Sequence, residues 1–161
     1  PDSPSSSCSP PKSSVKQINV HAPILTKKGY DCHPSIQELQ RMTDDELGSV
    51  KNFVIFRPGL GQIKWEGQTD VRDLNLDEIV VIENKMISVY DDIQENDKPP
   101  RGTELNKPAV VTLYQICPKT ITAEAIEKFE KKLQKSCNKN GSEFLHYDVD
   151  LEEWMFRVKH F

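Results

Sequence analysis

The last residues of the chain include a histidine in a position where chemistry is conceivable. A strand is predicted here, because apolar residues alternate at Trp154, Phe156 and Val158. The same alternation places His160 on the inner face of that strand. Histidine suits proton transfer near neutral pH, although a buried structural histidine is the alternative interpretation. Most domains end in a polar, frayed tail, whereas this sequence stops at His160-Phe161.

A glycine-rich segment, RPGLGQIKWEG at 57–67, is the second candidate. A phosphate-binding loop needs a helix N-terminus directly after its glycines, so that backbone amides and the helix dipole face the anion. Here Ile63 and Trp65 alternate with polar residues, which predicts a half-buried strand instead. We therefore predict a bent hairpin, in which glycine supplies backbone angles that other residues avoid.

The third candidate is the segment 91–108, DDIQENDKPPRGTELNKP, between two predicted strands. Loops of this length without secondary structure are uncommon in compact domains and are often functional. Its acidic residues lack the alternating spacing of a calcium-binding loop. We expect either a docking loop or a mobile excursion.

Composition limits the function further. The 161 residues carry a net charge of −4, so no overall positive field attracts nucleic acid. No apolar run reaches the roughly 18 residues of a membrane span, and no signal peptide is recognisable, so we expect no membrane insertion. The four cysteines form no C-x-x-C pair, and the neighbours Cys32 and His33 cannot easily reach one metal. We expect free thiols, no metal, no cofactor and no small-molecule substrate.

Residues 1–20 contain mainly serine and proline and have almost nothing to bury. Such a segment cannot offset its loss of chain entropy, so we predict a disordered tether followed by one folded domain at 21–161. Ser3-Pro4 and Ser9-Pro10 are candidate sites for proline-directed kinases, or simply parts of a linker.

The remaining pattern predicts the elements that position these segments. Two short helices are expected at about 35–42 and 43–48, because each begins with a capping-box spacing. Strands are expected at 53–56 and 109–114, and a tight hairpin at 79–90 turns at Asn84, which tolerates positive φ. Leu145, Tyr147 and Val149 alternate in a strand that precedes the last one.

One long helix is predicted from about Thr122 to Lys139, with Thr122 as its N-cap and Gly141 as its stop. Its apolar stripe and its i,i+4 Glu-Lys pairs are typical of an amphipathic surface helix. Its outer lysines either contact RNA or an acidic partner or are merely solvated. The sum is an α+β fold: a largely antiparallel sheet of about six or more strands, flanked by helices.

Several segments, in this order, resemble the C-terminal domain of the GLFG-repeat nucleoporins, the autoproteolytic, pore-targeting domain. The resemblance covers about 22–161 and is strongest to the fungal members. It rests on LTKKGY (25–30), PS (34–35), NFVI (52–55), GLGQI (59–63), KPP (98–100), LNKPA (105–109), VTL (111–113) and WMFRVKHF (154–161).

In members that cleave themselves, the break falls after His-Phe and before a serine. The resemblance implies that His160 occupies the general-base position and that Phe161 carries the scissile carbonyl. It also suggests that Asn106 helps polarise that carbonyl, although a buried asparagine more often satisfies backbone groups. No nucleophile follows Phe161 in this sequence, so we expect no enzymatic activity. A cleavage product and a natural terminus both remain open.

The resemblance implies an anchoring role at the nuclear pore complex, in the nucleus and nuclear envelope, in support of protein and mRNA transport. The implied partners are scaffold nucleoporins, especially a β-propeller subunit. Within the 91–108 loop, Lys98 and Arg101 are the expected docking residues. RNA binding is the alternative function, with Lys64 supplying charge and Trp65 a stacking surface.

Overall fold

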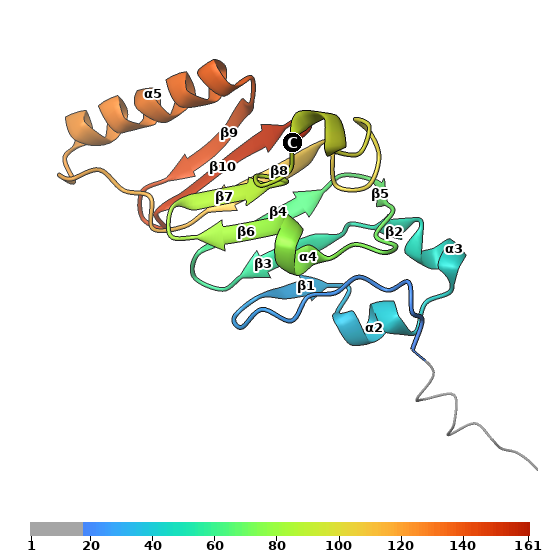
Figure 1. The fold of residues 1–161 in the computed structure, drawn as a ribbon. Helices are drawn as coiled ribbons and strands as arrows, with labels where there is room; N and C mark the ends of the chain where they lie inside the picture. The colour runs from blue at the N-terminus through green and yellow to red at the C-terminus, as the bar shows by residue number, and fades with distance from the viewer. Residues whose placement is uncertain (1–17) are drawn as a thin grey trace, which may run out of the picture.

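A six-stranded antiparallel sheet organises the computed structural model, which describes residues 18–161 (Figure 1). In spatial order the strands are β1 (Asp31–His33), β3 (Val54–Arg57), β4 (Gly61–Trp65), β8 (Ala109–Leu113), β10 (Glu153–Val158) and β9 (Glu143–Asp148). Every neighbouring pair is antiparallel. The predicted α+β fold class is therefore confirmed. The predicted kinase sites and most of the predicted tether lie outside the described residues.

Two short sheets accompany the main one. The first pairs β2 (Val50–Lys51) with β5 (Gln68–Thr69), and the second pairs β6 (Val80–Glu83) with β7 (Met86–Val89). The second is the predicted hairpin, but it forms a sheet of its own and does not extend the main sheet. Its turn takes the left-handed conformation at Lys85, with φ of 63°, so assigning that conformation to Asn84 was wrong.

The hairpin covers one face of the main sheet. On that face Ile55, Ile63 and Val111 lie opposite one another across three strands and are buried. A Cβ atom at Gly61 would lie 3.0 Å from Cδ1 of Ile87 on β7 and 2.7 Å from the carbonyl oxygen of Thr112. Glycine is therefore the residue that lets the hairpin approach β4 this closely.

The short helices begin as their caps predict. Helix α2 (Ile36–Gln40) is capped by Ser35, and α3 (Asp44–Leu47) has a complete capping box between Thr43 and Glu46. A third short helix, α4 (Leu76–Ile79), leads directly into β6. Each of these helices buries one leucine in the core.

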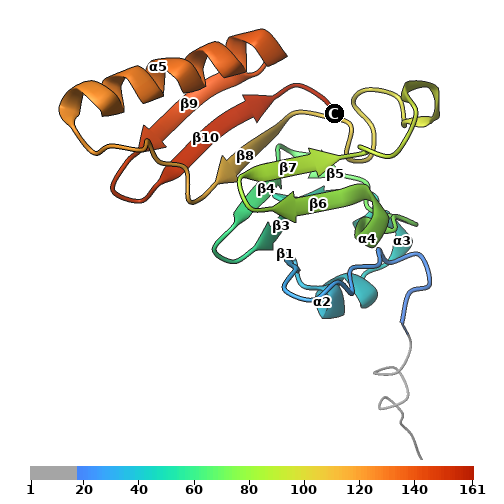
Figure 2. The same cartoon turned by 60° about the vertical axis from the view of Figure 1, so that its left-hand side comes forward.

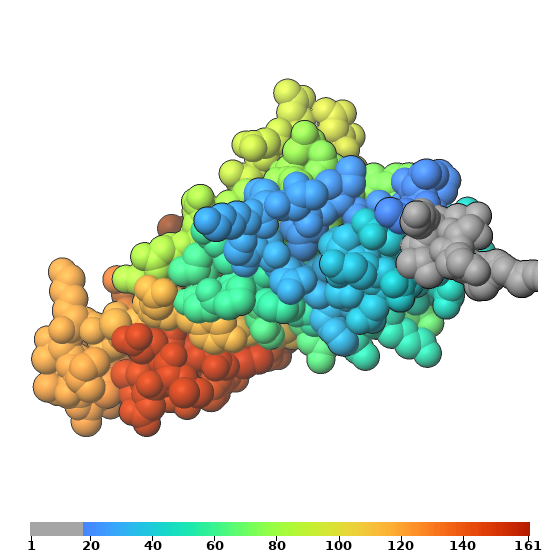
Figure 3. Space-filling model, turned by 90° about the horizontal axis from the view of Figure 1, so that it is seen from below, coloured from blue at the N-terminus to red at the C-terminus, as the bar shows by residue number. Residues whose placement is uncertain are grey.

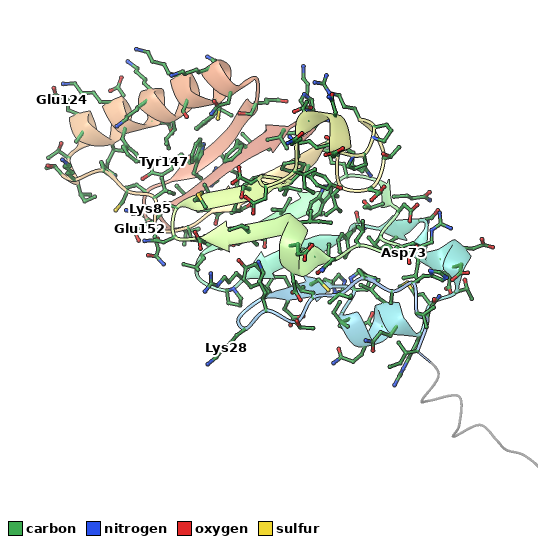
Figure 4. The ribbon with its side chains drawn as sticks, viewed as in Figure 1. Lys28, Asp73, Lys85, Glu124, Tyr147 and Glu152 are labelled. Atoms are coloured by element: carbon green, nitrogen blue, oxygen red, sulfur yellow. The ribbon has the colours of Figure 1, made fainter. Side chains whose placement is uncertain are left out.

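Helix α5 (Ala123–Asn140) runs along β9 at the far end of the sheet (Figure 2). Thr122 caps its first turn, and Gly141 ends it in the left-handed conformation, as predicted. Leu133 and Cys137 are buried, and the ring of Phe129 lies 5.5 Å from that of Tyr147. Figure 4 shows Tyr147 between β9 and this helix. No helix among the described residues is long and apolar enough to cross a membrane.

The alternation predicted for β9 fails at one residue. Leu145 is 40% exposed, although Tyr147, two residues on, is buried. The pairing of β9 with β10 shifts register between Met155 and Phe156, so that Phe144 and not Leu145 pairs with Phe156. A bulge of this kind inserts one unpaired residue and reverses the side-chain pattern beyond it.

Candidate functional site

The C-terminal residue is held against the body of the protein. The backbone N–H of Phe161 donates to Oδ1 of Asn106 at 2.8 Å, and its ring centroid lies 6.0 Å from that of Trp65. Figure 1 shows the C-terminus beside the loop that follows β7. Phe161 is half-buried. One polar and one aromatic contact therefore hold Phe161, the residue whose carbonyl the family resemblance predicts to be scissile.

Asn106 uses both ends of its side chain. Its Nδ2 donates to the carbonyl oxygen of Pro99 at 2.8 Å, while Oδ1 accepts from Phe161. The side chain is only 2% exposed. Because one partner can only accept and the other can only donate, the orientation of the amide is settled. The amide oxygen contacts the N–H of Phe161, while one of the two Nδ2 hydrogens is bound to Pro99. The expectation that Asn106 helps polarise the Phe161 carbonyl stays a prediction.

The peptide groups that precede Asn106 are held by two aromatic side chains. Nε1 of Trp65 donates to the carbonyl oxygen of Leu105 at 2.9 Å, and the N–H of Leu105 donates to Oη of Tyr90 at 3.3 Å. All three residues are buried. Burial also raises the pKa of Tyr90 to about 12, so its hydroxyl is neutral at physiological pH. The sequence pattern did not indicate Tyr90, because it lies 15 residues from its partner.

His160 does not lie on the inner face. Strand β10 ends at Val158, and both Lys159 and His160 are exposed. The prediction assumed that strand alternation continues to the last residue, and it was wrong because the chain leaves the strand before His160. The imidazole is adjacent in sequence to the seated Phe161 and is open to solvent.

The 91–108 segment is more ordered than predicted. It contains a 3₁₀ turn, η2 (Glu95–Asp97), and tight turns that return the chain to Asn106. Lys98 is only 17% exposed and lies 3.3 Å from the carboxylate of Glu95, whereas Arg101 is exposed. Of the two predicted docking residues, Arg101 is the more accessible.

The two predicted RNA-contacting residues, Lys64 and Trp65, lie on opposite faces of the sheet. Lys64 is exposed, but Trp65 is fully buried and contacts Phe53 and Phe161 with its ring. Trp65 therefore offers no surface on which a base could stack, and its assignment as an RNA contact was wrong. The two residues point to opposite faces because they are consecutive in β4.

Cys32 and His33, the neighbours that were considered as metal ligands, differ in exposure. Cys32 is buried, and desolvation, with the nearby Asp31 and Glu38 charges, raises its pKa to about 12. His33 is exposed on the next position of β1. Side chains on opposite faces cannot bind one ion, and no group of potential metal ligands occurs within residues 18–161.

Comparison with known protein families matches residues 27–161 to the nucleoporin family described as Nup98-96 autopeptidase S59. A Dictyostelium discoideum relative, nuclear pore complex protein Nup98-Nup96, is 44% identical over 151 residues, which cover 89% of this chain and 7% of that protein. Nucleoporin NUP145 of Saccharomyces cerevisiae is 31% identical over 151 residues, covering 83% and 11%. These values do not confirm the expected fungal membership. The chain spans only a small part of these relatives.

Solved structures show the same fold. The Nup145N autoproteolytic domain of Chaetomium thermophilum, as a mutant fused to an N-terminal part of Nup145C, superimposes with a TM-score of 0.74 at 27% identity. That match covers 82% of this chain and 94% of the other. A chain in the yeast Nup82-Nup159-Nup116 complex superimposes with a TM-score of 0.72 at 22% identity, covering 84% and 98%. At that identity the second likeness concerns the fold alone.

Proposed function

This chain belongs to the Nup98-96 autopeptidase family of nucleoporins, and we propose that it is a non-enzymatic anchor that docks a Phe-Gly repeat nucleoporin to scaffold nucleoporins. Its relatives are nuclear pore complex proteins, so the chain acts at the nuclear pore. There the anchored repeats would support nucleocytoplasmic transport of protein and mRNA.

The firmly held loop at 91–104 carries this proposal. It projects from the surface in Figure 3, where it is yellow. Its two ends are tied together by the hydrogen bond between Tyr90 and Leu105, and Asn106 binds the carbonyl of Pro99 within it. A loop that is ordered before binding loses less conformational entropy when a partner engages it. The projecting shape and the rigid base both suit a docking element.

The proposed partners are scaffold nucleoporins, a β-propeller subunit among them. Support comes from the yeast complex of Nup82, Nup159 and Nup116, which contains a chain of the same fold. Within the loop, Arg101 is the proposed contact residue, because arginine in a protein interface can bind carboxylates and stack on aromatic rings. Lys98 has the supporting role of holding the loop through Glu95.

A direct binding assay tests this proposal. Residues 18–161 are used as bait for purified scaffold nucleoporins, including a β-propeller subunit. We expect Arg101→Glu to weaken binding by about tenfold or more, the effect of losing an interface arginine. Lys132→Glu makes the same charge change on the exposed surface of α5 and should bind like the parent chain. Equal binding by both variants, or no binding by the parent, would refute the proposal.

A second candidate function is self-cleavage of a longer precursor after Phe161, and the Asn106–Phe161 hydrogen bond favours it. In the family reaction a serine hydroxyl attacks the Phe161 carbonyl carbon, the peptide C–N bond breaks, and its nitrogen takes up the proton as an amine. Water then hydrolyses the ester. Here the contacts of Phe161 with Asn106 and Trp65 would hold the carbonyl still, and the neighbouring His160 would accept the hydroxyl proton.

Extending the chain by Ser-Lys-Tyr tests this candidate. Mass spectrometry would show release of the added tripeptide if cleavage occurs, and His160→Ala should slow that release. The change of serine to alanine at the first added position should abolish it. An extended chain that remains intact for days would refute self-cleavage while leaving the docking proposal untouched.

A further inference from the structure

We infer that Tyr90 is a positioning residue, which acts through Leu105 to keep Asn106 aligned on the backbone of Phe161. This inference deepens the proposed self-cleavage and rests on it for the effect on cleavage. The attachment of Phe161 to the domain, through its hydrogen bond to Asn106 and its contact with Trp65, can be measured separately on the chain without an extension. Nothing in the sequence pattern links Tyr90 to Asn106 or to Phe161.

Two hydrogen bonds, joined by the peptide bond between Leu105 and Asn106, connect Tyr90 to Phe161. Oη of Tyr90 accepts from the N–H of Leu105, the next residue is Asn106, and Oδ1 of Asn106 accepts from the N–H of Phe161. Trp65 holds the other side of the Leu105 residue through its carbonyl. The peptide groups before Asn106 are thus fixed from two directions, which restricts where its short side chain can reach.

Tyr90 itself is held in an unusual conformation. Its φ is 62°, in the left-handed region that bulky residues rarely adopt. Its N–H donates to the carbonyl oxygen of Ile79 at 2.9 Å, and its side chain is buried. Such a conformation persists only where the surroundings determine it. Here it directs the hydroxyl of a residue at the start of the 91–104 loop toward the peptide at the end of that loop.

Loss of the Tyr90 hydroxyl has a specific consequence. The N–H of Leu105 would be left buried without an acceptor, and an unsatisfied buried donor is unfavourable. A shift of the Leu105 backbone toward solvent or another acceptor would satisfy this N–H at the lowest cost in free energy. That shift would move Asn106 with it and weaken the hydrogen bond to Phe161. Trp65 is less suitable as a probe, because its ring is also part of the core.

Carboxypeptidase A provides the first measurement. The enzyme can remove Phe161 only when this residue has detached from Asn106 and Trp65. The rate of release therefore reports the population of the detached state. We expect Tyr90→Phe to release Phe161 about tenfold faster, equivalent to one hydrogen bond of about 1.4 kcal/mol. The matched control is Tyr147→Phe, which loses a buried hydroxyl bonded to the carbonyl of Ile116. Its release rate should equal that of the parent.

A double-mutant cycle separates positioning from general destabilisation. If Tyr90 acts through Asn106, the substitution Tyr90→Phe should have no further effect on release in an Asn106→Ala background. The same fold-change in both backgrounds would overturn the inference, because it would mean that Tyr90 merely stabilises the fold. Equal release from Tyr90→Phe and the parent would overturn it as well.

The chain extended by Ser-Lys-Tyr then tests whether the attachment of Phe161 affects the rate of self-cleavage. We expect Tyr90→Phe to slow cleavage by about tenfold, in line with its effect on release, and Tyr147→Phe to cleave at the parent rate. If the extended parent chain does not cleave at all, self-cleavage is refuted, and the release experiment still decides the role of Tyr90. If the extended Tyr90→Phe chain cleaves as fast as the parent, Tyr90 does not position the reacting peptide.

Discussion

Replacing Gly61 by alanine should displace the β6–β7 hairpin from the main sheet. The added Cβ would lie 2.7 Å from the carbonyl oxygen of Thr112 and 3.0 Å from Cδ1 of Ile87. The first neighbour is backbone in the next strand and cannot turn away. The second is the end of a side chain on the hairpin and can move by a change of rotamer or by a shift of the hairpin.

The magnitude follows from the kind of contact. Overpacking a well-filled core by one methyl group costs about 1–3 kcal/mol, and the lower chain entropy of unfolded alanine offsets about 0.4–1 kcal/mol of it. A net loss of about 1–2 kcal/mol should lower the melting temperature of a domain of this size by about 2–8 °C. Thermal and urea unfolding, followed by circular dichroism, would measure it.

Two further variants make this prediction sharp. Gly59 lies in the turn just before β4, and a Cβ atom there meets no atom within 4 Å, so the cost of Gly59→Ala should come only from its φ of +82°. Ile87→Val removes the Cδ1 atom, so Gly61→Ala and Ile87→Val together should cost less than the sum of their separate effects. Strict additivity of the two, or a Gly61→Ala protein as stable as the parent, would refute the described packing of the hairpin on β4.

Three other measurements test the structure. The hydrogen bond with Arg157 lowers the pKa of Glu66, so Glu66→Gln should be less stable than the parent near neutral pH. That difference should shrink as the pH falls below the ordinary glutamate pKa of about 4.3. It should vanish below the lowered pKa of Glu66 in the folded protein, because the carboxylate is then protonated in both states. Removing 158–161 should destabilise the fold by about 1.5–3 kcal/mol or more in a denaturant titration, as apolar contacts and ladder bonds are lost; unchanged stability would contradict the contact of Phe161 with Trp65. Tyr30→Phe should cost about 1–3 kcal/mol, because the Tyr30 hydroxyl both donates to and accepts from the backbone of Ile82, and a melting curve identical to the parent would contradict that bridge.

Local signals predicted much of the secondary structure. The caps of α2, α3 and α5 lie at the expected residues, because a serine or threonine side chain bonds to a backbone N–H within its own turn. The hairpin at 80–89 and the glycine-rich turn before β4 were likewise visible in short sequence windows. Such interactions depend on neighbours a few residues apart, so they can be read without knowing the fold.

Predictions that extended a local pattern too far were wrong. Alternation placed Leu145 inside, but a bulge against β10 turned it outward. The same reasoning placed His160 inside, but the strand ends at Val158. Trp65 was offered as a stacking surface for RNA, with Lys64 supplying charge, whereas its side of β4 is the buried one. For Leu145 and Trp65 the deciding contacts come from other segments of the folded chain.

The sequence by itself determined the α+β class, the main helix and the family to which this chain is related, because periodicity, capping residues and an ordered set of motifs are properties of the chain alone. Only the tertiary structure decided that Asn106 reaches Phe161 across 55 residues, and that Trp65 and Tyr90 hold the peptide groups beside it. Hydrogen bonds and packing of this kind depend on which segments meet after folding. No local pattern records that, because the partners satisfy one another only in three dimensions.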